Sequence, residues 1–165
     1  MTKIYDFIYK VLLVMMISML VIMVATVSIN VFARFYGGGF SWIEEVSNLA
    51  FVWMAFTAIA LGLRYNIHPG FDLVLEKSSY RIKKVLMITV NVLILCFILY
   101  AFKGGIDYAI KSSIQRTAIL DISVSWKYAA IPFSTFFMAL ETLRKLVLIC
   151  KNDMSEIKNT NVGVL

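Results

Sequence analysis

Four long apolar runs, separated by shorter polar stretches, dominate the hydrophobic pattern of this chain. They cover residues 11–33, 43–63, 85–102 and 128–150. A transmembrane helix needs about 20 mostly apolar residues, because the hydrocarbon core of a bilayer is about 30 Å thick. Charged residues stand near the ends of these runs, and the other interruptions are Ser, Thr and Asn. The pattern therefore predicts an all-α integral membrane protein with four transmembrane helices.

Two segments outside the runs show periodicities of their own. Apolar residues in 4–11 recur at helical spacing among Lys3, Asp6 and Lys10, which predicts a short N-terminal helix lying in the headgroup plane. In 120–126, apolar and polar residues alternate, which predicts an extended segment with one wet face. We expect a single four-helix membrane domain over residues 1–152, followed by a flexible cytoplasmic tail over 153–165.

Composition supports the membrane assignment. The chain is 61% hydrophobic and 16% charged, with a mean hydropathy of +0.83. Soluble domains are about 45–50% apolar and about 25% charged. A chain of 165 residues cannot bury this excess in a core of its own, so we expect much of its surface to face lipid.

The basic residues predict the orientation. Eleven of the 16 Lys and Arg residues fall on the side of the two termini and the second loop, and five fall on the other side. Cytoplasmic loops carry the excess of Lys and Arg in membrane proteins. We therefore expect both termini in the cytoplasm. The net charge of +6 does not indicate nucleic acid, because the bases stand at the ends of apolar runs rather than in an aromatic-interleaved stripe.

The second run has one helical face made mostly of small or polar residues. Steps of four and three along this run connect Glu44, Asn48, Phe51, Ala55, Ala58 and Gly62. Small residues let membrane helices approach closely, and polar ones hydrogen-bond across the contact. Such a face packs either within the chain's own bundle or on a partner, and the sequence leaves both possibilities open. Trp42, just before this face, fits an interfacial anchor.

Three carboxylates are the candidates for chemistry within the runs. Glu44 and Glu45 follow Ser41, a possible N-cap, so they fit either helix capping and interfacial pairing or ion and proton handling. Glu141 stands three and four residues before Arg144 and Lys145, which predicts a neutralised pair near the inner surface.

No catalytic, metal or cofactor motif accompanies these carboxylates. His68 is the single histidine, whereas membrane anchors that carry b-type haem generally use two. Cys96 and Cys150 match neither a metal-site spacing nor a disulfide framework. We therefore expect neither an enzyme nor a bound cofactor.

The order of several residues resembles a known family. Ser41-Trp42-Ile43-Glu44-Glu45, then Trp53, then Arg64 followed by His68 and Asp72, resembles the small membrane subunit of tripartite ATP-independent periplasmic (TRAP) transporters, the DctQ-like family. In that family the histidine is often followed by a small apolar residue and then the acid, but here three residues, 69–71, intervene. The family's loop shape is therefore not transferred to this segment.

A second stretch carries the same resemblance. Residues 122–132, including Trp126 and Pro132, are similar to that family's usual entry into its last helix. The resemblance implies a bacterial inner-membrane subunit that packs against the fixed scaffold of a large membrane subunit. A periplasmic binding protein would capture an organic acid, and the large subunit would carry it with sodium. The implied interface residues are Trp42, Glu44, Asn48, Ala55, Ala58 and Gly62, with residues 34–40 and 117–126 near the docked binding protein.

Two other classes compete with this interpretation. A stand-alone four-helix proton-coupled transporter, acting as a homodimer, would need an essential carboxylate within the membrane, for which Glu44, Glu45 and Glu141 are the candidates. A membrane anchor of a redox enzyme would need haem ligands, which a single histidine does not supply.

Overall fold

The computed structural model describes residues 2–65 and 80–151, and this part of the chain is almost entirely helical. The helices are α1 (Thr2–Phe35), α2 (Ser41–Arg64), α4 (Tyr80–Lys111), the single turn α5 (Ser125–Tyr128) and α6 (Ala130–Cys150). No named strand occurs within the described ranges. The all-α class is therefore confirmed. The predicted tail, 153–165, lies outside the described residues.

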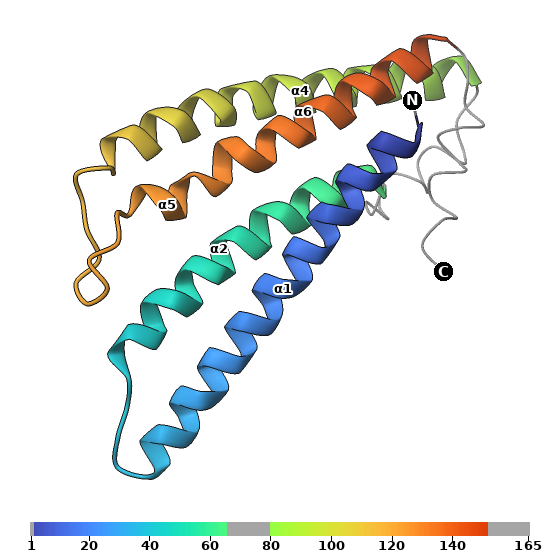
Figure 1. The fold of residues 1–165 in the computed structure, drawn as a ribbon. Coiled ribbons are helices and arrows are strands. Elements are labelled where there is room, and N and C mark those ends of the chain that lie inside the picture. Colours follow the sequence, from blue (N-terminus) through green and yellow to red (C-terminus); the bar gives the residue numbers. More distant parts are fainter. Residues whose placement is uncertain (1, 66–79, 152–165) are drawn as a thin grey trace.

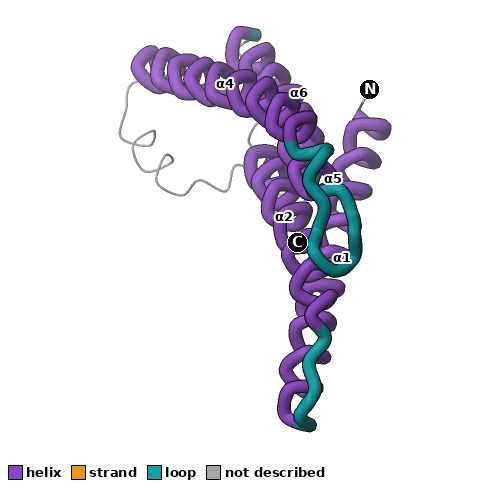
Figure 2. Tube along the Cα trace, turned by 90° about the vertical axis from the view of Figure 1, so that its left-hand side faces the viewer, coloured by secondary structure: helices purple, strands orange, loops and turns teal. Residues whose placement is uncertain are grey.

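The helices form two antiparallel hairpins. α1 packs against α2, and α4 packs against α6, with α2 and α6 joining the hairpins (Figure 1). The hairpins meet closely near the start of α1 and the ends of α2 and α6, which we call the terminal end. They diverge toward the opposite end, where loops connect α1 to α2 and α4 to α5 (Figure 2). We call this opposite end the loop end.

Three helices are long and apolar enough to cross a membrane: Tyr5–Phe35, Ser41–Arg64 and Lys84–Lys111. These match three of the four predicted spans. The third is longer than the predicted 85–102, because helical sequence continues past the apolar run. Helix α6 has 21 residues and lies beside α4, but Glu141, Arg144 and Lys145 lower its apolar character. Its crossing of the membrane stays a prediction, as does the orientation of the termini.

The first helix corrects one prediction. The structure has no separate N-terminal interfacial helix, because α1 continues unbroken from Thr2 to Phe35. No Gly or Pro interrupts this segment, so nothing in the sequence breaks the backbone hydrogen bonding. At 1.5 Å per residue, a helix of this length exceeds the hydrocarbon thickness of a bilayer. Its first turns therefore belong to the bundle rather than to a separate element.

The turn between α1 and α2 depends on a glycine and a buried amide. Gly37 adopts a positive φ of 78°, and the N–H of Gly38 donates to the carbonyl of Ala33 at 3.0 Å, which ends α1. The side chain of Asn30, 8% exposed, accepts from the N–H of Phe40 at 3.1 Å. Phe40 is the N-cap of α2 and no side chain caps the helix, so the expectation that Ser41 caps it is wrong.

The loop before α5 corrects another prediction. Instead of one extended segment over 120–126, the chain makes a tight turn with a bridge between Arg116 and Ser123. The N–H of Thr117 donates to the carbonyl of Ile122 at 2.9 Å, and Asp121 adopts a positive φ of 52°. Trp126 already lies in α5. The alternating residues thus belong to a hairpin-like turn, in which residues 115–117 bond to 122–124, and to the start of α5.

The core is small and lies where the hairpins meet. One cluster joins Ala60 and Leu63 of α2 to Ile98 of α4 and Met138 of α6. A second joins Tyr9 and Leu12 of α1 to Leu61 of α2, with aromatic side chains of α6 beside them. In the most apolar stretch of each helix, 18 residues long, 6% of the residues are buried in α1 and 6% in α4, against 28% in α2. Helix α2 is therefore the central helix.

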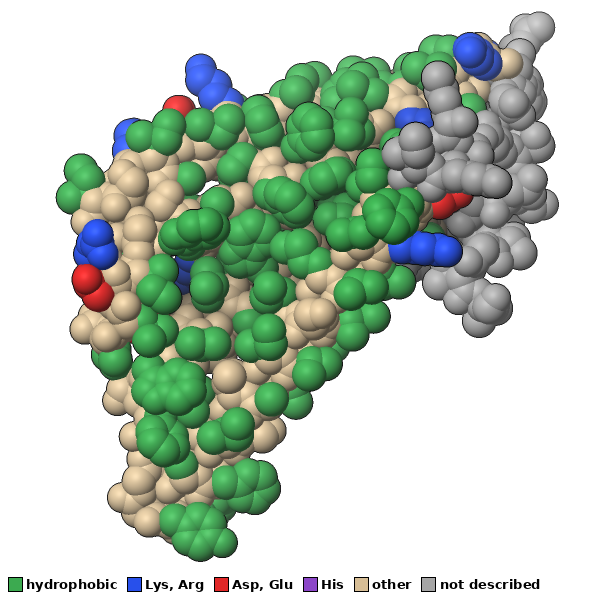
Figure 3. Space-filling model, viewed as in Figure 1, with side chains coloured by type: hydrophobic (Ala, Val, Ile, Leu, Met, Phe, Trp, Pro, Cys, Tyr) green, Lys and Arg blue, Asp and Glu red, His purple; other side chains and the backbone are tan. Residues whose placement is uncertain are grey.

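The apolar surface is correspondingly large. Figure 3 shows hydrophobic side chains covering the middle of the molecule, with charged side chains gathered toward its ends. In water such a surface would drive association, whereas in a bilayer it faces lipid or a partner helix. The arrangement is that of an integral membrane protein.

Candidate partner-binding surfaces

Helix α2 buries a face that the sequence pattern did not single out. Its buried residues are Ile43, Ala50, Thr57, Ala60, Leu61, Leu63 and Arg64. They face α1, α4 and α6, and the hydroxyl of Thr57 bonds back to the carbonyl of Trp53 at 2.6 Å. The fully buried core of this chain therefore includes no residue from the small and polar face of α2.

The small and polar face of α2 lies outside this core. Glu44, Asn48 and Phe51 are exposed, and the smaller residues Ala55, Ala58 and Gly62 are partly exposed. A Cβ atom added to Gly62 would meet no heavy atom within 4 Å. We call the set Glu44, Asn48, Phe51, Ala55, Ala58 and Gly62 the open α2 face. None of these six residues belongs to the buried set of α2, and Gly62 has free space beside it.

At the start of α2, both carboxylates have partners. Glu44 forms an ion pair with Arg34 at 2.7 Å, and both side chains are about two-thirds exposed. Glu45 accepts the N–H groups of Ile119 and Leu120, each at 3.0 Å (Figure 1 shows this loop hanging from α4 toward α2). Glu44 thus secures the turn after α1, and Glu45 secures the loop before α5.

Trp53 and Pro132 also join distant parts of the chain. The indole N–H of Trp53 donates to the carbonyl of Trp126 at 3.0 Å, which connects α2 to α5. Pro132 stands in the first turn of α6, where no backbone donor is needed. It and Ile131 approach Gly105 so closely that a Cβ atom there would lie 2.7 Å from Cγ2 of Ile131.

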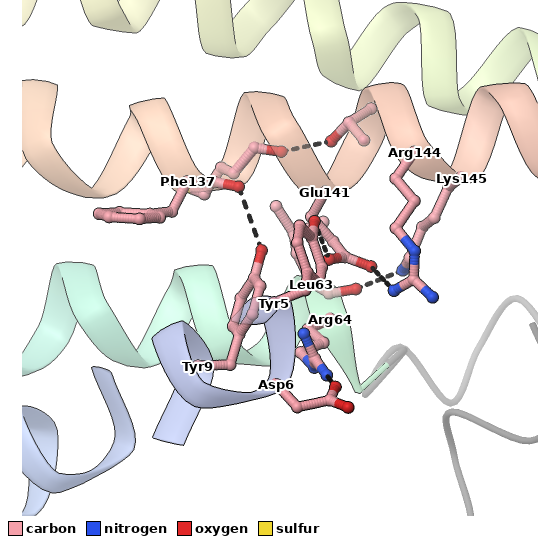
Figure 4. Close-up of polar contacts among 11 residues, drawn as sticks. Tyr5, Asp6, Tyr9, Leu63, Arg64, Phe137, Glu141, Arg144 and Lys145 are labelled. Carbon is pink, nitrogen blue, oxygen red and sulfur yellow. Dashed lines mark hydrogen bonds and ion pairs between the residues drawn. The ribbon is translucent and has the colours of Figure 1, made fainter. Parts of the chain in front are cut away.

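The terminal end holds a buried polar cluster, drawn in Figure 4. Glu141 is 2% exposed, accepts the hydroxyl of Tyr5 at 2.9 Å and lies 3.7 Å from Arg144. Lys145 donates to the carbonyl of Leu63, near the end of α2. The predicted pairing of Glu141 with Arg144 is present, but Lys145 turns into the bundle instead of reaching for the surface. The hydroxyl of Tyr9 extends the cluster to the carbonyl of Phe137 at 3.4 Å.

Arg64 is the second centre of this cluster. It is 7% exposed, pairs with Asp6, and its guanidinium carbon lies 4.1 Å from the ring centroid of Tyr9 and 5.3 Å from that of Tyr5. A desolvated cation over aromatic rings gains favourable interaction with their electron-rich faces. Its Nε and Nη1 atoms have no hydrogen-bond partner. The stacking thus compensates a charge whose hydrogen bonding is incomplete.

Most of the motif residues therefore make contacts that hold the chain together. Glu45, Trp53, Arg64, Trp126 and Pro132 each join segments far apart in the sequence. Ser41 is exposed, and His68 and Asp72 lie outside the described residues. Sequence reasoning missed Asn30, Tyr5, Asp6 and Tyr9. The clustering of tyrosines and an acid in the first ten residues was the available signal.

Within residues 2–65 and 80–151, no group of three His, Cys, Asp or Glu side chains is placed to hold a metal ion. Cys96 and Cys150 are free, exposed thiols. The described part of the chain thus offers surfaces for contact with lipid and with other helices.

Comparison with known proteins agrees with this picture. The family model of tripartite ATP-independent periplasmic transporters, DctQ component, matches residues 23–152. A protein of Haemophilus influenzae named as a TRAP transporter small permease protein is 26% identical over 147 residues, covering 87% of this chain and 89% of its own length. A second protein of that organism with the same name is 33% identical over 78 residues, about half of each chain.

The family match covers all the described helices after α1 and residues 23–35 of α1 itself. It includes residues 41–72 and 122–132, the two stretches on which the resemblance was based. This family is a component of transporters and not a family of enzymes. The chain belongs to the DctQ family, the small permease component of tripartite ATP-independent periplasmic transporters.

Proposed function

We propose that this chain is the small membrane subunit that packs against the scaffold of a large TRAP subunit in the bacterial inner membrane, and supports sodium-coupled uptake of an organic acid. The open α2 face carries this proposal. Its small residues are partly exposed although the bundle is already closed by other residues of α2. Small residues are what a close helix contact in a membrane requires, and at Gly62 this chain places no heavy atom within 4 Å of an added Cβ.

In this proposal the chain crosses the membrane four times, with both termini in the cytoplasm and one domain over residues 1–152. Glu141, Arg144 and Lys145 do not oppose the crossing of α6, because their polar atoms meet partners inside the bundle. The loop end would then face the periplasm. Residues 34–40 and 117–126 would lie near the docked binding protein, and a lipid-facing surface would surround the rest.

Orientation has a direct test. Ile114 is 90% exposed at the loop end, so a cysteine there is accessible. In a variant that lacks Cys96 and Cys150, Ile114→Cys should react with a membrane-impermeant maleimide in intact spheroplasts. Labelling only after the inner membrane is opened would place the loop end in the cytoplasm and overturn this topology.

The subunit role is tested by Gly62→Leu and Ala58→Leu in a tagged chain purified from native membranes in mild detergent. Each should lower the yield of the co-purifying large subunit and, in cells, organic-acid uptake. The added side chain would hold the partner helix away from α2. Because a Cβ atom at Gly62 meets nothing in this chain, its own thermal unfolding should change little.

Gly104→Leu is the matched control. Gly104 lies on α4 and likewise has no heavy atom within 4 Å of an added Cβ, but it is far from the open α2 face. It should leave the yield of the large subunit unchanged. Unaltered association in both α2 variants would rule out this face as the interface. A homodimer without any large subunit would overturn the proposed function, and Glu44, Glu45 and Glu141 would then be tested as transport carboxylates.

A further inference from the structure

A small cleft lies at the loop end, between the first two turns of α2 and the loop that precedes α5. Its volume is about 170 Å³. Apolar side chains form most of its wall: Val46, Leu49, Leu120, Ile122 and Val124. The polar residues at its border are Glu45, Asn48, Thr117, Ser123 and Lys127. The cleft therefore combines an apolar trough with a polar rim.

The two charged groups of this rim, Glu45 and Lys127, form no ion pair with each other. Lys127 forms no ion pair with a carboxylate of the described residues, and its ammonium nitrogen lies 5.9 Å from the ring centroid of Tyr128. The carboxylate of Glu45 is already engaged by the N–H groups of Ile119 and Leu120. Thr117 and Ser123 are also hydrogen-bonded, to Ile122 and Ser113. Lys127 is thus a cation beside an apolar trough, with no carboxylate of the described residues within ion-pair distance.

Aromatic side chains place this rim at the depth of lipid headgroups. Trp42 and Trp126 are exposed at this end of the molecule, and Tyr108 packs edge-on against Tyr128. Tryptophan and tyrosine gather at the membrane–water interface, because their rings are apolar at one end and polar at the other. A molecule that meets the cleft from the bilayer therefore brings its headgroup to Lys127 and its acyl chain to the trough.

We propose that this cleft binds one anionic phospholipid from the leaflet at the loop end. Its phosphate pairs with the ammonium of Lys127, Asn48 donates to the glycerol–phosphate region, and one acyl chain lies along Val46 and Leu49. The lipid would fill the wedge where the two hairpins diverge, at the edge of the open α2 face. This inference does not rest on the proposed transport role, because it requires only that the chain resides in a membrane.

The test is native mass spectrometry of the full-length chain in mild detergent, with phosphatidylglycerol or phosphatidylcholine added at equal concentration. The wild-type chain should retain phosphatidylglycerol preferentially. Lys127→Gln should reduce that retention about fivefold, the loss expected for one Lys–phosphate contact near a membrane surface. Val46→Asn should reduce the retention of either lipid, because it makes the trough polar. Thermal unfolding checks that each variant remains folded.

Lys111→Gln is the matched control, because Lys111 is an exposed lysine at the same end of the molecule but not at the cleft. It should retain phosphatidylglycerol like the wild type. Equal retention of both lipids together with an unaffected Lys127→Gln variant would overturn the proposal. So would displacement of the lipid by millimolar inorganic phosphate, which would indicate a simple anion site. Loss of the lipid when the large subunit co-purifies would assign the cleft to a protein side chain and would also overturn it.

Discussion

The two ends of this bundle are held together in different ways. At the terminal end, ionisable side chains are buried among aromatic rings: Glu141 is 2% exposed and Arg64 is 7% exposed. At the loop end, the two ion pairs, Arg34–Glu44 and Arg116–Asp121, are exposed, and the contacts between hairpins use backbone groups. Glu45 accepts two backbone N–H groups, and Trp53 donates to a backbone carbonyl. Within the α4–α6 hairpin, Gly105 allows Ile131 to approach closely.

The two ends should therefore differ in which substitutions destabilise them. A buried charge that loses its partner keeps its full desolvation cost, so the terminal end depends on side-chain identity. An exposed pair loses little when it is broken, so the loop end depends on backbone geometry and on small residues. The terminal end is therefore held mainly by buried side-chain contacts, and the loop end mainly by contacts to the backbone.

Glu141→Ala, at the terminal end, should cause the largest loss of stability. It leaves the hydroxyl of Tyr5 without its acceptor and removes the ion pair to Arg144, at a cost of about 3 kcal/mol of unfolding free energy. Thermal unfolding in detergent measures the loss. Glu141→Gln is the control, because the amide oxygen still accepts from Tyr5, and it should lose distinctly less. Equal losses would mean that the charge of Glu141, and not its hydrogen bond, dominates the cluster.

Gly105→Ala probes the backbone packing of the loop end. The new methyl group would lie 2.7 Å from Cγ2 of Ile131, so α4 and α6 must move apart, which costs about 2 kcal/mol of unfolding free energy. Gly104→Ala meets nothing within 4 Å and should not destabilise the chain. The pair is compared by thermal unfolding. A double variant with Ile131→Ala should recover part of the loss, and no recovery would contradict the steric explanation.

Glu45→Gln should loosen the loop before α5 without loosening the rest of the bundle. Only one oxygen would remain to accept from the two N–H groups of Ile119 and Leu120, so the loop before α5 should open more often. Hydrogen exchange should become faster in the peptide containing residues 119–120 and stay unchanged in α6. Faster exchange throughout α6 would mean that Glu45 supports the whole bundle.

Arg34→Gln should have the smallest effect. Its ion pair with Glu44 is about two-thirds exposed on both sides, and such pairs contribute less than about 1 kcal/mol. Its melting temperature should also depend less on salt than that of the wild type. A loss as large as that of Glu141→Ala would show that the loop end resembles the terminal end after all.

The apolar runs predicted the helices well, because whether a segment can cross a membrane depends on the summed hydrophobicity of about 20 consecutive residues. Three spans were found with nearly the expected centres, and the family resemblance along residues 41–72 and 122–132 was confirmed by the match over residues 23–152. The element boundaries were less accurate. The predictions of a separate N-terminal helix and of an extended segment over 120–126 were both wrong. The first segment is part of the longer helix α1, and the second forms a turn and the start of α5.

The contact partners were harder to predict. Glu141 was expected to pair within its own helix, and it does so, but its closest partner is Tyr5, 136 positions away. Periodicity describes which residues share a face of one helix, and it carries no information on which helix that face meets. The roles of Asn30, Asp6 and Tyr9 were missed for the same reason.

Three properties of the protein follow from its sequence alone: it is helical, it resides in a membrane, and it resembles one transporter family. The packing of the helices shows in addition that α2 is central, that its small and polar face lies outside the core, and that Arg64 and Glu141 are buried at the terminal end. The reason is physical: in a membrane, lipid and protein interior are equally apolar, so hydrophobicity cannot distinguish a buried helix face from an exposed one. That distinction arises only when helices cross and their polar groups find partners.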